Sequence, residues 1–234
     1  MTTILCIETS GHTCSVSLGS DGVCIFHRSD NAGQAHSRLL HPFIQDALNH
    51  AREQDLSINA VAVSAGPGSY TGLRIGVSAA KGIAYALDIP LLAVETLDLL
   101  ASTALQHVNN CDALLCPMID ARRMEVYTAL YNQQLQTIQP ISASIIDHHS
   151  FEDTLASTPV CFFGSGAAKC KDVLSSPNAL FLETIDTDAR YMCGLAQNLY
   201  EKNHSVDVAY FAPHYLKDFV ATRPHNKVLD RTSR

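Results

Sequence analysis

Short apolar runs separated by turn residues open the chain. Strands are expected at 3–9, 13–19 and 22–29, because Gly11 and the pair Asp21-Gly22 supply turns between β-rich segments. Apolar residues then recur at helical spacing from 36 to 51. The pattern continues with strands at 59–66 and 90–95 and with helices at about 71–87 and 97–107. The expected order of the first half is therefore βββαβαβα.

The second half begins again with strands. Strands are expected at 112–120, 124–132, 138–147 and 159–164, and helices at 150–156, 167–174 and 187–202. Two similar halves without a linker predict an α/β fold made by duplication, with central mixed sheets flanked by helices in two βββαβα-type halves. The expected divisions are 1–107, 108–216, and a basic, loose tail at 217–234.

Composition narrows the class of protein. The chain is 47% hydrophobic, has no basic leader and no window of eighteen apolar residues, so we expect a cytoplasmic protein without a membrane segment. A net charge of -7 disfavours unaided nucleic-acid binding, although the tail sets five Lys or Arg against two Asp. The eight cysteines include no C-x-x-C. Buried free thiols are expected at Cys6, Cys14, Cys24, Cys116 and Cys161.

The stretch "SAGPGSYTGLRIG" at 64–76 looks like a phosphate loop. Counting its spacings excludes the P-loop, because no Gly-Lys-Ser/Thr follows, and the dinucleotide pattern, because Gly66, Gly68 and Gly72 give G-x-G-x-x-x-G. Anion binding at the following helix N-terminus stays open. In that helix, small residues fall at every fourth position from Gly72 to Ala84, which favours close approach of another helix.

Other chemistry has little support from the residues. No two of the eleven His show i, i+4 spacing, so no metal site is expected, and no G-x-S-x-G surrounds a serine. Two carboxylates are more informative: Glu8 and Asp120 end equivalent strands of the two halves. Together they would face one cleft and hold phosphates with a divalent metal, or each would merely cap a turn.

Several segments carry a resemblance to a known family. The stretches "ILCIETSGHTCSVSL", "HSRLLHPFI", "AVAVSAGPGSYTGLRIGVSAAKGIAYALDIPLLAVETLDLLA" and "MIDARRMEVYTALY" resemble the TsaB family over about the first 135 residues, with "GSGAAK" and "APHYLK" matching more weakly. The resemblance implies an actin-like ATPase fold. It also implies a non-catalytic subunit of the bacterial machinery that makes threonylcarbamoyladenosine in tRNA. The implied partners are the catalytic paralogue TsaD and the ATPase TsaE, with a homodimer when the chain is alone.

The chain differs from catalytic relatives at the positions where those relatives bind iron and phosphate. Leu97, Leu99 and Leu100 stand where TsaD-like chains carry an H-x-x-x-H iron site. Arg122 and Arg123 follow Asp120 where actin-like ATPases have glycines. The resemblance therefore implies a degenerate nucleotide site, made of Glu8, Thr9, Ser10, Asp120, Arg122, Arg123, Gly164 and Gly166.

The sequence thus predicts a catalytically silent scaffold that holds and activates a TsaD-type transferase. No catalytic residue, metal or intrinsic cofactor is expected. The chain is expected to contact tRNA only through the complex. Whether a nucleotide binds at the junction with the partner is left open by the sequence. The runner-up is an independent ATP-dependent enzyme or small-molecule kinase that uses Glu8 and Asp120 for magnesium. The predicted partner interface consists of Ser69, Tyr70, Thr71, Leu73, Arg74, Gly76, Val77, Ala80, Lys81 and Ala84.

Overall fold

The first half is built on a five-stranded mixed sheet. We describe a computed structural model at residues 1–31, 36–108 and 112–217. The strand order is β3-β2-β1-β4-β5, with β1–β2 and β2–β3 antiparallel and β1–β4 and β4–β5 parallel. The strands are β1 (Thr3–Glu8), β2 (Cys14–Ser20), β3 (Val23–Asp30), β4 (Ile58–Gly66) and β5 (Leu91–Glu95).

The second half repeats this arrangement. Its order, β10-β9-β6-β7-β8, places three antiparallel strands beside two parallel ones, as in the first sheet. The strands are β6 (Leu114–Asp120), β7 (Glu125–Tyr131), β8 (Thr137–Ile145), β9 (Val160–Phe163) and β10 (Ala179–Phe181). The predicted duplication of an α/β unit is confirmed.

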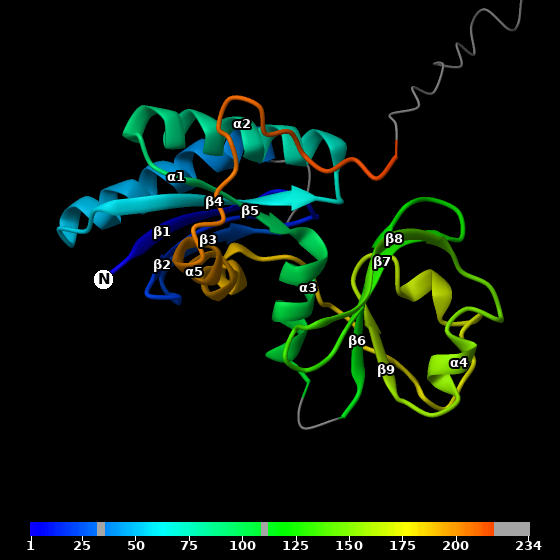
Figure 1. The fold of residues 1–234 in the computed structure, drawn as a ribbon. Coiled ribbons are helices and arrows are strands. Elements are labelled where there is room, and N and C mark those ends of the chain that lie inside the picture. The colour runs from blue at the N-terminus through cyan, green and yellow to red at the C-terminus, as the bar shows by residue number, and fades with distance from the viewer. Residues whose placement is uncertain (32–35, 109–111, 218–234) are drawn as a thin grey trace, which may run out of the picture.

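Helices cover the first sheet on both faces (Figure 1). Helices α1 (His36–Glu53) and α2 (Tyr70–Leu87) pack on one face, where Leu40, Ile44 and Val77 join the strand residues of one apolar core. Helix α5 (Cys193–Glu201) packs on the opposite face. The central strands β1 and β4 are apolar on both faces because both faces are covered.

The second sheet has less cover. Helix α3 (Thr96–Leu105) lies between the halves and packs against β6 and β7. On the other face lie α4 (Glu152–Leu155), four residues long, and a 3₁₀ turn at Ala168–Cys170. The helix expected at 167–174 is wrong: only Ala168–Cys170 form a 3₁₀ turn, and hydrogen-bonded turns follow it. The three-residue strand β10 was not anticipated.

The C-terminal part of the second half returns to the first sheet. Residues Ala189–Met192 form a 3₁₀ turn ahead of α5, because Ser15 Oγ takes the Ala189 N–H at 2.9 Å and Asp188 caps Arg190. Met192, Cys193 and Ala196 then join the core formed by β1, β4 and β5. The expected helix from 187 is therefore shorter, and residues 189–201 do not pack with the second half to which the sequence assigned them. The boundary at residue 107 stays a prediction.

A C-terminal strap, residues 204–217, crosses the molecule from α5 past β5 and α2 toward the second half (Figure 1). Val206 pairs with Leu91, the His214 N–H bonds Ala65 O at 2.7 Å, and Lys217 pairs with Glu125 of β7. The predicted tail begins at this last residue, and the rest of it lies outside the described residues. The strap therefore ties both halves together.

The described cysteines are free thiols, as predicted, and all except the half-buried Cys24 are buried. No helix among the described residues is long and apolar enough to cross a bilayer.

Candidate functional site in the cleft between the halves

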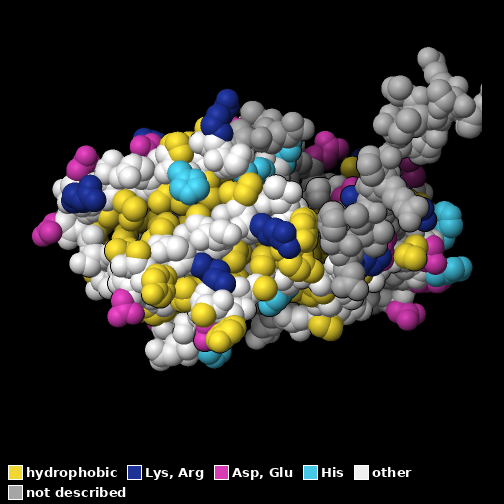
Figure 2. Space-filling model, turned by 90° about the horizontal axis from the view of Figure 1, so that it is seen from above, with side chains coloured by type: hydrophobic (Ala, Val, Ile, Leu, Met, Phe, Trp, Pro, Cys, Tyr) yellow, Lys and Arg dark blue, Asp and Glu magenta, His cyan; other side chains and the backbone are white. Residues whose placement is uncertain are grey.

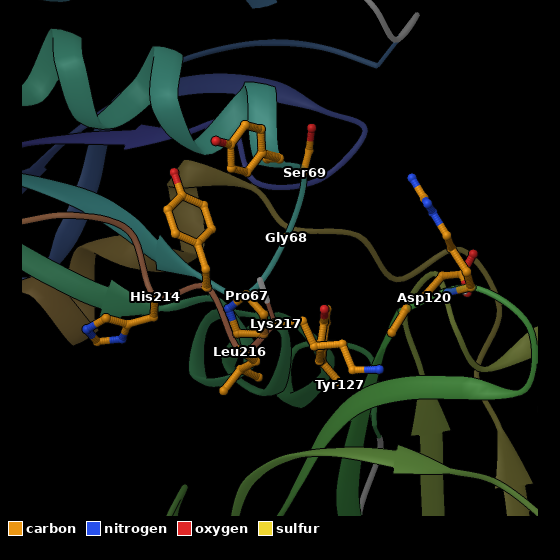
Figure 3. Close-up of a pocket in the computed structure, with 12 residues that line it drawn as sticks. Pro67, Gly68, Ser69, Asp120, Tyr127, His214, Leu216 and Lys217 are labelled. Atoms are coloured by element: carbon orange, nitrogen blue, oxygen red, sulfur yellow. The ribbon is translucent and has the colours of Figure 1, made fainter. Parts of the chain in front are cut away.

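Two adjoining cavities lie in the cleft between the halves, and both are lined by Gly68, Ser69 and Asp120. One, of about 560 Å³, continues past Gly164 and the crossing segment 184–187. The other, of about 370 Å³, opens beneath the strap and is shown in Figure 3. We call them the crossing-side cavity and the strap-side cavity.

The loop after β4 forms the upper wall of both cavities. Gly66 ends the strand with φ +115°, a conformation that favours glycine. A Cβ at Gly68 would lie 2.6 Å from Ser10 O, so this loop sits directly on the end of β1. Ser69 then caps α2 by accepting the Gly72 N–H at 3.2 Å. The quoted glycine-rich stretch is thus a close-packed turn that brings the start of α2 to the cleft.

Glu8 ends β1 but does not face the cleft. Its carboxyl group is fully buried and accepts the Ser10 N–H and Ser10 Oγ at 2.5 Å each, Thr187 Oγ1 at 3.1 Å, and Ser64 Oγ. Burial raises the pKa of Glu8 to about 7, and the hydrogen bonds from Ser10 and Thr187 only partly offset that rise.

Of the two interpretations, the one in which Glu8 and Asp120 line one cleft is therefore wrong. The interpretation in which each acid caps a turn is confirmed, because each accepts the N–H of the residue two positions further on. Hydroxyl groups from the turn after β1, from β4 and from the crossing segment surround the Glu8 carboxyl group, so it serves as a buried polar junction. Thr9 is buried too and donates to Gly72 O at 2.8 Å, whereas Ser10 reaches the wall of the crossing-side cavity.

Asp120, at the end of β6, lies in the open. Its side chain is 50% exposed and pairs with Lys169, while the Arg122 N–H donates to it at 3.0 Å. Burial pushes its pKa upward, but the Lys169 ammonium and the Arg122 N–H outweigh that effect, so the pKa lies below its usual value. Arg122 and Arg123 follow with φ of +72° and +49°, the left-handed conformation that glycines prefer. Arg122 lines the strap-side cavity.

The glycine turn at 164–166 is explained by packing. Gly164 has φ +93°, and a Cβ there would lie 2.6 Å from Met118 O. A Cβ at Gly166 would lie 2.8 Å from Val126 Cγ1. Gly164 lines the crossing-side cavity but Gly166 does not. The nucleotide contact expected at this turn stays a prediction.

Helix α2 turns its stripe of small residues inward. Gly72, Gly76, Ala80 and Ala84 are all buried within this chain, and a Cβ at Gly76 would collide with Thr9 Oγ1. The assignment of Gly76, Ala80, Ala84, Leu73 and Val77 to a partner interface is therefore wrong, because these residues cover the chain's own strands. The small side chains allow α2 to lie close to β1 and β4.

The outer face of α2 carries a different set of small residues. Thr71, Ser78, Gly82 and Ala86 are exposed, and a Cβ at Gly82 would meet open space. Tyr85 beside them is 83% exposed. Figure 2 looks down on the layer of α1 and α2 and shows hydrophobic side chains gathered over it. This outer face is available to another chain.

Three further residues of the predicted interface, Tyr70, Arg74 and Lys81, contact the strap. Lys81 Nζ donates to Ala209 O at 3.0 Å and to Phe211 O at 2.9 Å. Arg74 lies over the Tyr70 ring at 4.2 Å and donates to the Tyr215 hydroxyl at 3.3 Å. These side chains hold the strap on α2. The sequence did not single out Tyr127, Tyr215 or Lys217 as site residues, although the segment "APHYLK" already stood out.

No group of His, Cys, Asp and Glu suited to a metal ion occurs among the described residues. The two sheets of identical strand order, joined across a cleft, define a duplicated actin-like α/β fold. The chain is similar to a solved structure described as YeaZ from Pseudomonas aeruginosa, with a TM-score of 0.77 and 26% identity over 92% of this chain and 100% of that one.

Sequence comparison gives the family. The model described as "TsaD: tRNA N6-adenosine threonylcarbamoyltransferase" matches residues 29–225. The chain is 38% identical to tRNA threonylcarbamoyladenosine biosynthesis protein TsaB of Bacillus subtilis, over 59% of this chain and 60% of that relative. It is 28% identical to the TsaB protein of Haemophilus influenzae, over 93% of this chain and 94% of the relative. The chain belongs to the TsaB family.

Proposed function

We propose that this protein is a subunit of the complex that forms threonylcarbamoyladenosine in tRNA. It would bind and activate a TsaD-type transferase and would carry out no chemistry itself. Family membership supports the pathway, and the state of the two strand-end acids supports the silent role. Glu8 is buried and hydrogen-bonded to Ser10, and Asp120 is tied to Lys169. Neither of these two acids is therefore a free carboxylate for magnesium and a nucleotide.

The outer face of α2 is the partner surface in this proposal. Ser78, Gly82 and Ala86 are exposed at every fourth position and leave a smooth strip that follows Arg74 and is flanked by Tyr85, which allows a partner helix to approach closely. The same strip would serve a homodimer of the isolated chain. The proposal also includes a TsaE-type ATPase as a further partner and a nucleotide bound at the junction with the transferase. It places the complex in the cytoplasm.

Reconstitution tests this role. The chain is combined with the transferase, the ATPase, threonylcarbamoyl-adenylate and tRNA, and modified adenosine is measured with the chain present and omitted. We expect modification to depend on the chain. Undiminished modification without it would reject the proposal. Tight Mg-ATP binding with turnover by the lone chain, measured by calorimetry and phosphate release, would instead support an independent enzyme.

A further inference from the structure

The strap-side cavity has walls unlike those of the crossing-side cavity. Tyr70, Tyr127 and Tyr215 line it together with Arg122 and Lys217, so three rings and two cations share one opening. Figure 3 shows Tyr127 and Lys217 on the side opposite Ser69. Glu125 and Tyr127 lie two residues apart on β7 and share a face, and Lys217 pairs with Glu125, which places its amine beside the ring.

Positive charge is in excess around this cavity. Asp120, Glu125 and Glu95 are already paired with Lys169, Lys217 and His214 respectively. Within the described residues no carboxylate pairs with Arg74, Arg122 or Arg123. Arg122 at the cavity wall, and Arg74 and Arg123 outside it, therefore have no carboxylate partner among the described residues and can attract an anion, although the whole chain has a net charge of -7.

The aromatic walls point to a ligand with flat rings. Tyr70 and Tyr215 lie 5.0 Å apart between ring centroids and already contact each other. No ring contact between described residues involves Tyr127, which is half-buried at the cavity wall. A half-buried tyrosine beside cations is the arrangement that stacks a nucleic-acid base and holds its phosphate.

We propose that the strap-side cavity and its arginine rim bind a single-stranded segment of RNA. One base stacks on Tyr127, its phosphate meets Arg122, and neighbouring phosphates meet Arg123 and Arg74. A free nucleotide shares this chemistry, but Arg74 and Arg123 lie outside the cavity wall, where only a longer strand reaches them. The inference rests on the proposed function, which supplies tRNA as the natural RNA.

Fluorescence anisotropy of the full chain at low salt tests the site. The probe is a fluorescein-labelled single strand of RNA about eight nucleotides long, a length within the usual span of such sites. We expect Arg122→Glu to weaken binding about tenfold, since it removes a phosphate contact and adds repulsion. Lys202→Glu, the same charge change at the exposed end of α5, should alter binding by about twofold or less. Equal losses in both variants would overturn the proposal.

The ring is tested separately from the charge. Tyr127→Leu should weaken binding at least about fivefold, whereas Tyr127→Phe keeps the stacking surface and should bind like the parent chain. Thermal unfolding checks that both variants are folded. Adenosine monophosphate should compete poorly with the RNA strand, because it reaches Arg122 alone. If adenosine monophosphate competes at the same concentrations as the RNA strand, the RNA site is rejected and the cavity is a mononucleotide site.

The reconstituted complex separates this inference from the proposed function. There, Arg122→Glu should raise KM for tRNA and leave kcat at saturating tRNA unchanged. If the chain is required but this variant leaves KM unchanged, the RNA site is rejected. If the chain is dispensable while RNA binding by the lone protein still depends on Arg122, the function is rejected and the site stands.

Discussion

Strands β1 and β6 occupy the same central place in the two sheets, and each ends in an acid, yet the two ends have opposite surroundings. Two helices of eighteen residues and the strap cover the first sheet, and Glu8 is completely buried. A four-residue helix and one 3₁₀ turn cover the same part of the second sheet, and Asp120 is half-exposed. Duplication therefore preserved the strand order while one end became a packed junction and the other an open charged turn.

The packed end should be intolerant of bulk. Gly76→Arg places a side chain against Thr9 at the end of β1, and we expect it to lower the free energy of unfolding by about 3 kcal/mol or more. Gly82→Arg, six residues further along the same helix, meets open space and should change stability by less than about 1 kcal/mol. Urea unfolding followed by circular dichroism measures both.

The same pair locates the partner surface. Gly82→Arg should remain folded and lose association with the transferase in a pull-down, because its bulk stands on the outer face of α2. A folded Gly82→Arg chain that still binds the partner would move the interface elsewhere. A fully stable Gly76→Arg chain would show that the end of β1 is not tightly packed.

Glu8 should make the stability of the protein fall as pH rises. Its pKa is about 7 in the folded chain against an ordinary 4.5, so the folded state holds the proton more tightly than the unfolded state. The stabilisation is complete below about pH 4.5 and is lost as pH rises to about 7, a change of about 3 kcal/mol. Denaturant unfolding across this range measures it.

Glu8→Gln is the matched control for this pH dependence. Burial also raises the pKa values of Glu95 and Asp98, so the parent chain alone does not isolate Glu8. The glutamine variant cannot titrate at this position and should lack the extra slope between pH 4.5 and 7. Identical slopes in parent and variant would show that folding does not raise the pKa of Glu8.

The sequence predicted the order of elements because apolar periodicity and turn residues are local signals. It could not predict which face of α2 points inward, because Leu73, Ile75, Val77 and Ile83 make that helix apolar on most sides. The choice depends on Thr9, more than sixty residues away in the chain. Only the folded structure shows that Thr9 packs against the small residues of α2.

The two acids illustrate the same limit at the site. Both were found from their positions at strand ends, and the position of each is confirmed. Their environments come from distant segments: Thr187 closes over Glu8, and Lys169 pairs with Asp120. No pattern near either acid encodes those contacts.

Asp120→Asn should have the smallest effect on stability. The pair with Lys169 is half-exposed and screened by water, so its loss should lower the free energy of unfolding by only about 0.5 kcal/mol. Since the pKa of Asp120 is lowered, the contribution is present at neutral pH and is lost as pH falls below the usual range of the group, the reverse of Glu8. A double-mutant cycle with Lys169→Met, run at low and high salt, measures the coupling. A coupling that high salt leaves unchanged would place Asp120 in a buried network, and the contrast between the two strand ends would then fail.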